Sequence, residues 1–236
     1  MEATARSYLS TMPLHAITEI HGESGLRERF ALQIAGFAPA DRQRLEDALD
    51  LADQLHADDR RVREPYLNHL LRVAIRLMSH YEVDDVDVIV AAVLHDAVED
   101  HPLELAGAVP DPVKAAFDVL AARFGPRVAE LVRAVTNPAY DPARDPDEQY
   151  REHVAASLDR QPWARVIKMS DFTDNGVGVI HTTGPKVVRA ATKYRPMVPL
   201  LRELMGRPDT PLAPDVKRHI ADQLDLAEER FRAILD

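Results

Sequence analysis

Apolar residues recur every three or four positions along most of the chain, with charged residues between them. This spacing is typical of amphipathic helices, in which one face is buried. Only nine glycines are present, too few for a fold built on tight turns. The chain is therefore expected to be all-α, with helices at about residues 41–56, 65–81, 84–100, 111–124, 126–135, 147–159, 163–175, 186–205 and 214–235.

The segment 84–100 differs from the others because it is apolar nearly all round. Its run from Val86 to Leu94 holds no charge after Asp87, which predicts a central helix packed on every side. Its β-branched residues are also compatible with a buried strand, but the chain has no second run of this kind to pair with it. A central helix is the preferred interpretation.

The first 40 residues carry a weaker pattern. Two short alternating runs flank Glu23-Ser24-Gly25, which is compatible with a small hairpin or with an extension. Residues 41–236 are then predicted to form one domain. The N-terminal stretch lacks the apolar core of a signal peptide, and no segment approaches the ~20 apolar residues of a membrane span. A cytoplasmic protein without a membrane partner is expected.

Composition limits the chemistry. The chain has 29 Lys and Arg against 39 Asp and Glu, a formal net charge of −10, which argues against DNA or RNA as a partner. It has no cysteine, which excludes disulfides, thiolate zinc sites and thiol nucleophiles. Any metal ion must therefore be held by histidines and carboxylates.

The densest ionisable cluster directly follows the most apolar run. His95, Asp96, Glu99 and Asp100 lie in the sequence VAAVLHDAVEDHP, where burial of acids without a counter-charge costs several kcal/mol. If the helix is continuous, the i,i+4 spacing places these groups on adjoining faces of one turn. One imidazole nitrogen beside one carboxylate oxygen suits manganese, iron or zinc better than calcium.

Five blocks carry a family resemblance: EPYLNHLLRVA, AAVLHDAVEDHP, FGPRVAELVRAVTN, RVIKMSDFTDN and ATKYRPMVPLLREL. In this order they resemble the HD phosphohydrolase superfamily, and within it the (p)ppGpp hydrolase domain of RelA/SpoT-type proteins and stand-alone small alarmone hydrolases. The resemblance covers about residues 51–205 and implies an HD-domain helical bundle. It also implies a stand-alone hydrolase, because only about thirty residues follow Met205.

The resemblance implies a site and a reaction. It implies one divalent metal ion, typically Mn²⁺, and hydrolysis of the 3′-pyrophosphate of guanosine 3′,5′-bis(diphosphate) (ppGpp) or of pppGpp to GDP or GTP, respectively, and pyrophosphate. Glu99 and Asp100 would be the catalytic acid pair that orients or deprotonates water. The implied metal ligands are His69, His95, Asp96 and Asp171.

The implied substrate contacts are Arg60, Arg61 and Asn175, with Lys168 as a weaker candidate. The arginines also lie beside acidic residues, so an ordinary solvated charge run is the alternative reading of that segment. The other histidines, His56 and His101 among them, have no supporting motif and are predicted to be surface or local hydrogen-bonding residues.

One block departs from the family. Relatives usually read Asp-Arg-x-x-Asn-x-Arg where this chain has DFTDNGV from Asp171 to Val177, so both arginines are missing. Another nucleotide, such as an adenosine analogue of the alarmone or a 2′-phosphorylated dinucleotide, is therefore an alternative substrate. A catalytically silent nucleotide-sensing module is the alternative of another class, against which the intact acid pair argues. The last helix is expected to cap the core or to mediate a homodimer.

Overall fold

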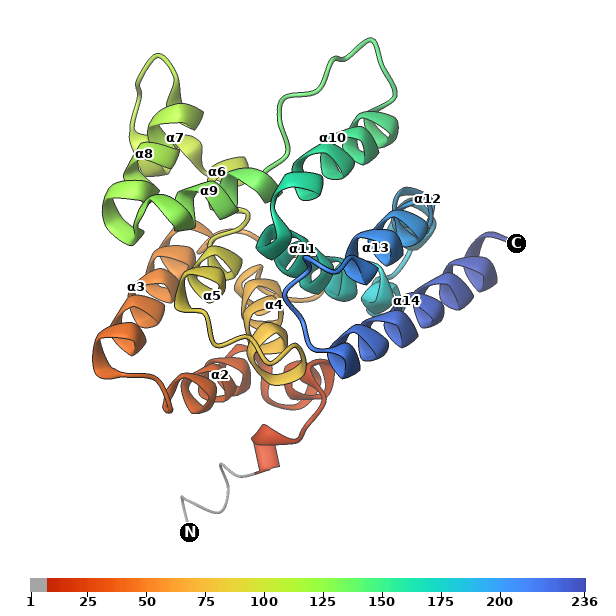
Figure 1. Cartoon of the computed structure of the whole chain (residues 1–236), viewed down its shortest axis with the longest axis horizontal. Helices are drawn as coiled ribbons and strands as arrows, with labels where there is room; N and C mark the ends of the chain where they lie inside the picture. Colours follow the sequence, from red (N-terminus) through yellow and green to blue (C-terminus); the bar gives the residue numbers. More distant parts are fainter. Residues whose placement is uncertain (1–7) are drawn as a thin grey trace. The chain divides into compact units, whose positions relative to one another are not determined.

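The computed structural model describes residues 8–236 and divides the chain into two compact units, one ending at Val128 and the other running from Ala129 to Asp236. Each unit is a bundle of helices (Figure 1). Residues 8–236 contain no β-strand, and the one bridge of strand type joins Arg60 to Pro65. The predicted all-α fold is confirmed.

The first unit is built around two buried helices. Both α4 and α5 pack against α3, and they pack against each other. Residues Val88 to Leu94 have no exposed surface, which settles the alternative between helix and strand in favour of a central helix. The elements of this unit are η1 (Tyr8–Ser10), α2 (Leu14–Ile34), α3 (Pro39–Leu55), α4 (Leu67–His80), α5 (Val86–Val93), α6 (Ala97–Asp100), α7 (Pro102–Ala106) and α8 (Pro112–Phe124), and α9 (Pro126–Val135) crosses the boundary.

The hairpin considered for the N-terminal region does not form. Residues 14–34 are the helix α2, which packs against α4 and buries Ile17, Leu26 and Phe30. Gly22, with φ of 61°, kinks this helix, so the buried positions before and after it do not follow one helical register. That interruption explains why the sequence resembles two short alternating runs. The division into an extension at 1–40 and a domain at 41–236 stays a prediction.

The second unit surrounds a buried helix, α11. Its residues from Ala164 to Asp174 are all buried, and it packs against α10, α13 and η2. The single helix predicted at 186–205 is wrong, because the chain is divided there into two helices with Pro196 between them. The elements are α10 (Pro146–Arg160), α11 (Pro162–Asn175), η2 (Val177–His181), α12 (Pro185–Tyr194), α13 (Met197–Gly206) and α14 (Pro214–Leu235).

Proline marks the start of many helices. The first residue is proline in α3, α7, α8, α9, α10, α11, α12 and α14. Proline suits this position because its fixed φ is helical and the first turn needs no donor from its nitrogen. Among the described helices, none combines the length and apolar character needed to cross a membrane.

Candidate active site

The HD pair, His95 and Asp96, lies in a break between two helices. The predicted continuous helix at 84–100 is wrong: α5 ends at Val93, and α6 begins at Ala97. The Ala97 N–H donates to the Leu94 carbonyl at 3.0 Å, three residues back, so this turn is tighter than an α-helix. The tight turn, rather than one helical face, therefore presents the two side chains.

Three metal-ligand side chains of the first unit converge here. His69, in the first turn of α4, and His95 are 1% and 2% exposed. Asp96 Oδ2 lies 3.8 Å from His69 Nε2 and 3.0 Å from His95 Nε2. One ligand atom from each of the three lies within 4.8 Å of the other two. Three of the four predicted ligands are thus brought together.

The protonation of His95 indicates what this group accommodates. Its Nδ1 lies 2.9 Å from the Ala92 carbonyl, which can only accept, so Nδ1 carries a proton. In the neutral ring Nε2 then bears a lone pair that faces the Asp96 carboxylate at 3.0 Å. Two such atoms at this distance are stabilised by a positive charge between them, which either a proton on Nε2 or a metal cation supplies. A divalent cation of the manganese, iron or zinc type fits these donors, and the Ala92 carbonyl orients the ring as in known metal sites.

Tyr66 supports the HD pair. Its hydroxyl donates to Asp96 Oδ2 at 2.7 Å. Burial and the charges of Asp96 and Asp100 raise the pKa of this phenol, so it stays protonated and remains a donor. Tyr66 lies in the first family block, yet nothing in its position along the chain signalled this contact, because its partner is 30 residues away.

The acid pair, Glu99 and Asp100, lies on α6, one turn beyond the HD pair, and both residues are exposed. Part of the Asp100 carboxyl is withdrawn from water, and this, with the charges of Asp96 and Glu99, raises its pKa to about 6. A carboxyl with such a pKa can both accept and release a proton near neutral pH, as a general base or acid must.

Replacing Asp100 with Asn is expected to stabilise the metal-free protein above pH 6. The charges of Asp96, Glu99 and Asp59 oppose ionisation of Asp100, and His101 favours it. Because the pKa is raised in the folded state, the folded protein binds the extra proton between about pH 4 and 6, and the penalty is complete above pH 6. After allowance for solvent screening we expect about 1 kcal/mol, or ~2–4 °C in Tm.

Thermal unfolding of chelator-treated protein at pH 8 and pH 4 measures this effect. The gain should be present at pH 8 and absent at pH 4. Asp118→Asn, which changes an exposed carboxylate on α8, is the control. An Asp100→Asn variant with the Tm of the wild type at pH 8 would contradict the raised pKa.

The loop from Asp59 to Tyr66 presents the predicted basic residues. It closes through the Tyr66 N–H to the Asp59 carbonyl at 3.1 Å and the Arg61 N–H to the Glu64 carbonyl at 2.9 Å. The Arg61 guanidinium lies 6.0 Å from the centre of the Tyr66 ring, within cation–π range. Since Tyr66 binds Asp96, Arg61 lies near the HD pair. Arg60 is exposed on the same loop.

A buried ion pair anchors this loop. Arg72, on α4 and 1% exposed, donates to the two Glu64 oxygens at 2.6 and 2.7 Å, and Asn68 donates to Glu64 at 3.0 Å. Arg72 also donates to Thr18 of α2 at 3.1 Å. The sequence reading assigned none of these residues a role. The signal was present in Arg72, a charged residue among apolar residues in the middle of a helix, followed one turn later by Arg76.

The second unit holds the remaining predicted residues, all on α11. Asp171 is 5% exposed. Lys168 Nζ donates to its Oδ2 at 2.8 Å, and the Asn175 amide donates to its Oδ1 at 2.5 Å. Burial opposes the charge of Lys168, but Asp171 outweighs it and raises the lysine pKa well above the ordinary value. Lys168 and Asn175 thus hold the Asp171 carboxylate ionised and oriented.

Comparison with known proteins finds partial similarity to one family. Residues 48–161 match the HD domain family model. The chain is 29% identical over 160 residues to guanosine-3′,5′-bis(diphosphate) 3′-pyrophosphohydrolase of Aquifex aeolicus, covering 65% of this chain and 20% of the relative. It is 37% identical over 108 residues to the enzyme MESH1 of Danio rerio, and the matched part covers 45% of this chain and 51% of MESH1. The chain therefore spans about half or less of the length of these relatives.

A solved structure shares the fold. A metazoan orthologue of SpoT, described as hydrolysing ppGpp, superimposes with a TM-score of 0.57 at 24% identity, over 81% of this chain and 97% of that one. The chain therefore has an all-α fold that is also found in a solved structure. Residues 48–161 of the chain are thus similar to the HD domain, and parts of the chain are similar to the MESH1 and SpoT-type proteins.

Proposed function

We propose that this protein hydrolyses the 3′-pyrophosphate of guanosine 3′,5′-bis(diphosphate) (ppGpp) or of its 5′-triphosphate form (pppGpp), giving pyrophosphate and GDP or GTP, respectively. The observation that carries the proposal is the convergence of His69, His95 and Asp96 beside the acid pair. The activities named for the Aquifex aeolicus and Danio rerio relatives supply the substrate class.

A divalent cation is part of the proposal, with Mn²⁺ as the preferred ion. When bound, such a cation acidifies a water molecule and neutralises phosphate charge. His69, His95 and Asp96 would hold it, and we propose Asp171 as the fourth ligand because of its place in the family block. The contacts of Asp171 with Lys168 and Asn175 support this role, since both keep a carboxylate fixed.

The chain's own groups then move the proton. Asp100, with its pKa near 6, accepts the proton of the attacking water, and Glu99 orients that water. The water oxygen attacks the phosphorus that is bonded to the 3′ oxygen. The bond between this phosphorus and the 3′ oxygen breaks, and the 3′ oxygen takes up a proton. Arg60 and Arg61 are proposed to bind the phosphates or the base of the nucleotide. Lys168 and Asn175 are proposed to contact the nucleotide as well as donating hydrogen bonds to Asp171.

The test is a substrate panel with the full chain and Mn²⁺. Release of pyrophosphate from ppGpp is expected, with little orthophosphate. Glu99→Gln and Asp100→Asn should each lower kcat by about 100-fold, the usual scale of general acid–base catalysis, while Asp118→Asn leaves it unchanged. Orthophosphate as the only product, or full activity in both acid variants, would contradict the proposal.

A second substrate is favoured by one observation in the second unit. Phe172 and Val177, which stand where relatives usually carry arginine, are 2% and 5% exposed. The Phe172 ring packs against Tyr194 and Phe231. These positions contribute to the core and supply no cation, so the panel includes an adenosine analogue and a 2′-phosphorylated dinucleotide. Nucleotide binding without turnover of any of them would favour the silent sensor. Cytoplasmic location and a homodimer stay predictions.

A further inference from the structure

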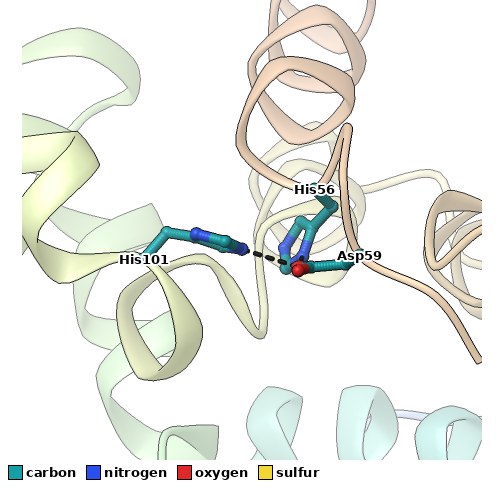
Figure 2. Close-up of side chains that lie close together, drawn as sticks. All are labelled: His56, Asp59 and His101. Atoms are coloured by element: carbon teal, nitrogen blue, oxygen red, sulfur yellow. Dashed lines mark hydrogen bonds and ion pairs between the residues drawn. The ribbon is translucent and has the colours of Figure 1, made fainter.

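A second cluster of metal-ligand side chains lies in the first unit, and it shares no residue with the HD pair or His69. His56 ends α3, Asp59 lies in the loop that follows, and His101 lies between α6 and α7. Figure 2 shows both imidazoles beside the Asp59 carboxylate. His56 Nδ1 and His101 Nε2 each lie 2.7 Å from the same oxygen, Asp59 Oδ2.

The burial of this His56–Asp59–His101 cluster is graded. The side chain of His56 has no exposed surface, that of His101 is 14% exposed and that of Asp59 is 36% exposed. The cluster is therefore rigid on its inner side and open to water at the carboxylate. An ion has a route in, and coordination positions remain for water.

Hydrogen bonding alone leaves the cluster incompletely satisfied. A single carboxylate oxygen collects both imidazoles, and His56 Nε2 is buried without a hydrogen-bond partner. Nε2 is not the nitrogen that faces Asp59, so a metal bound to Nδ1 would leave it as it is. The candidate site is formed by the convergence of His56 Nδ1, Asp59 Oδ2 and His101 Nε2.

The protonation states suit a cation. Burial lowers the pKa of His56, so the ring is neutral at pH 7 and carries a lone pair. Burial raises the pKa of Asp59, but the hydrogen bonds from His101 and His56 outweigh this and lower it below the ordinary value. Neutral imidazole and ionised carboxylate are the forms that bind metals.

Neighbouring residues orient the ligands. The Tyr66 ring stacks on the His56 ring, with centres 4.8 Å apart and planes 14° apart. Glu104 Oε1 lies 3.7 Å from His101 Nδ1, the ring nitrogen that does not face Asp59. Carboxylates beside the second nitrogen of a ligating histidine are usual in metal sites. Because the Tyr66 hydroxyl binds Asp96, the cluster is also linked to the HD pair.

We propose that His56, Asp59 and His101 bind a second divalent metal ion, of the Zn²⁺ type, with water in the remaining position. Two imidazole nitrogens and one carboxylate oxygen are a ligand set that Zn²⁺ accepts. The ligand atoms of a tetrahedral zinc site are about 3.3 Å apart, so the present 2.7 Å separations must open by roughly 0.6 Å. Asp59, in a partly exposed loop, supplies that movement.

The test separates this site from the HD site by mutation. The full chain is stripped with a chelator and titrated with Zn²⁺, and bound metal is counted by elemental analysis and calorimetry. We expect two ions per chain in the wild type and one in the double variant His95→Ala, Asp96→Asn. In that double variant, adding His101→Gln should weaken the remaining site at least about 10-fold. His80→Gln, which changes an exposed histidine of α4, should leave it unchanged.

Two further measurements distinguish loss of a metal ligand from misfolding of the variant. Asp59→Asn, which changes a partly exposed loop residue to one of similar size, should give the same loss as His101→Gln. In the double variant, Zn²⁺ should raise Tm only while the cluster is intact, because only binding to the folded state stabilises it. No zinc bound in the double variant, or zinc retained after both His101→Gln and Asp59→Asn, overturns the proposal and leaves a proton-bridged triad.

Discussion

Replacing Asp96 with Asn is expected to lower kcat/KM for ppGpp by at least about 1000-fold and to weaken Mn²⁺ binding at the HD site. The Asp96 carboxylate faces both His69 and His95, at 3.8 and 3.0 Å. Asn keeps the size of the side chain but removes the negative charge that attracts the cation. A loss of about 4 kcal/mol in transition-state stabilisation corresponds to this factor.

Steady-state kinetics across a Mn²⁺ titration measure the effect, and calorimetry measures the metal affinity. Asp118→Asn is the matched control, since it removes an exposed carboxylate elsewhere. Tyr66→Phe should give an intermediate loss of about 10- to 100-fold, because it removes one hydrogen bond to Asp96 and leaves the ligand in place. Unchanged metal affinity in Asp96→Asn would show that the HD pair is not the metal centre.

The helices that the sequence predicted best begin or end at local signals. The predicted limits of α9 and α14 agree with the structure, and both helices begin at a proline, Pro126 and Pro214. Such signals act within a few residues and are readable without tertiary contacts. The kink of α2 at Gly22 and the break after Val93 depend on packing and on a turn conformation that the spacing of apolar residues does not reveal.

Sequence patterns predicted the residues of the candidate site that lie in the family sequence blocks, but not the contacts that support them. The quoted blocks brought out His69, His95 and Asp96, and the structure places them together. Supporting contacts such as Tyr66 to Asp96 join residues 30 positions apart, and single-sequence patterns carry no information about such pairs. His56 is buried and forms a local hydrogen bond to Asp59, which agrees with the second of the two predicted roles, surface or local hydrogen bonding. His101 instead bonds Asp59 across 42 positions, a contact that the prediction of a local bond missed.

Replacing Arg72 with Met is expected to lower the free energy of unfolding by about 3 kcal/mol. The change removes two hydrogen bonds to Glu64 and one to Thr18. The Glu64 carboxylate, only 19% exposed, loses the guanidinium that faces it and keeps the hydrogen bond from Asn68. Breaking a buried pair from one side costs about 3–5 kcal/mol, and the partial exposure of Glu64 places the expectation at the lower end. Urea unfolding at pH 7, followed by far-UV circular dichroism, measures the loss.

A double-mutant cycle with Glu64→Gln shows whether an uncompensated charge is the cause. Because the double variant Arg72→Met, Glu64→Gln contains no charge at the anchor, it should recover at least about 1 kcal/mol relative to Arg72→Met alone. Recovery of stability without recovery of ppGpp hydrolysis would show that the ion pair also fixes the loop carrying Arg60 and Arg61. A loss below about 1 kcal/mol in Arg72→Met would instead mean that the fold tolerates the buried carboxylate, because its exposed fraction suffices to solvate it.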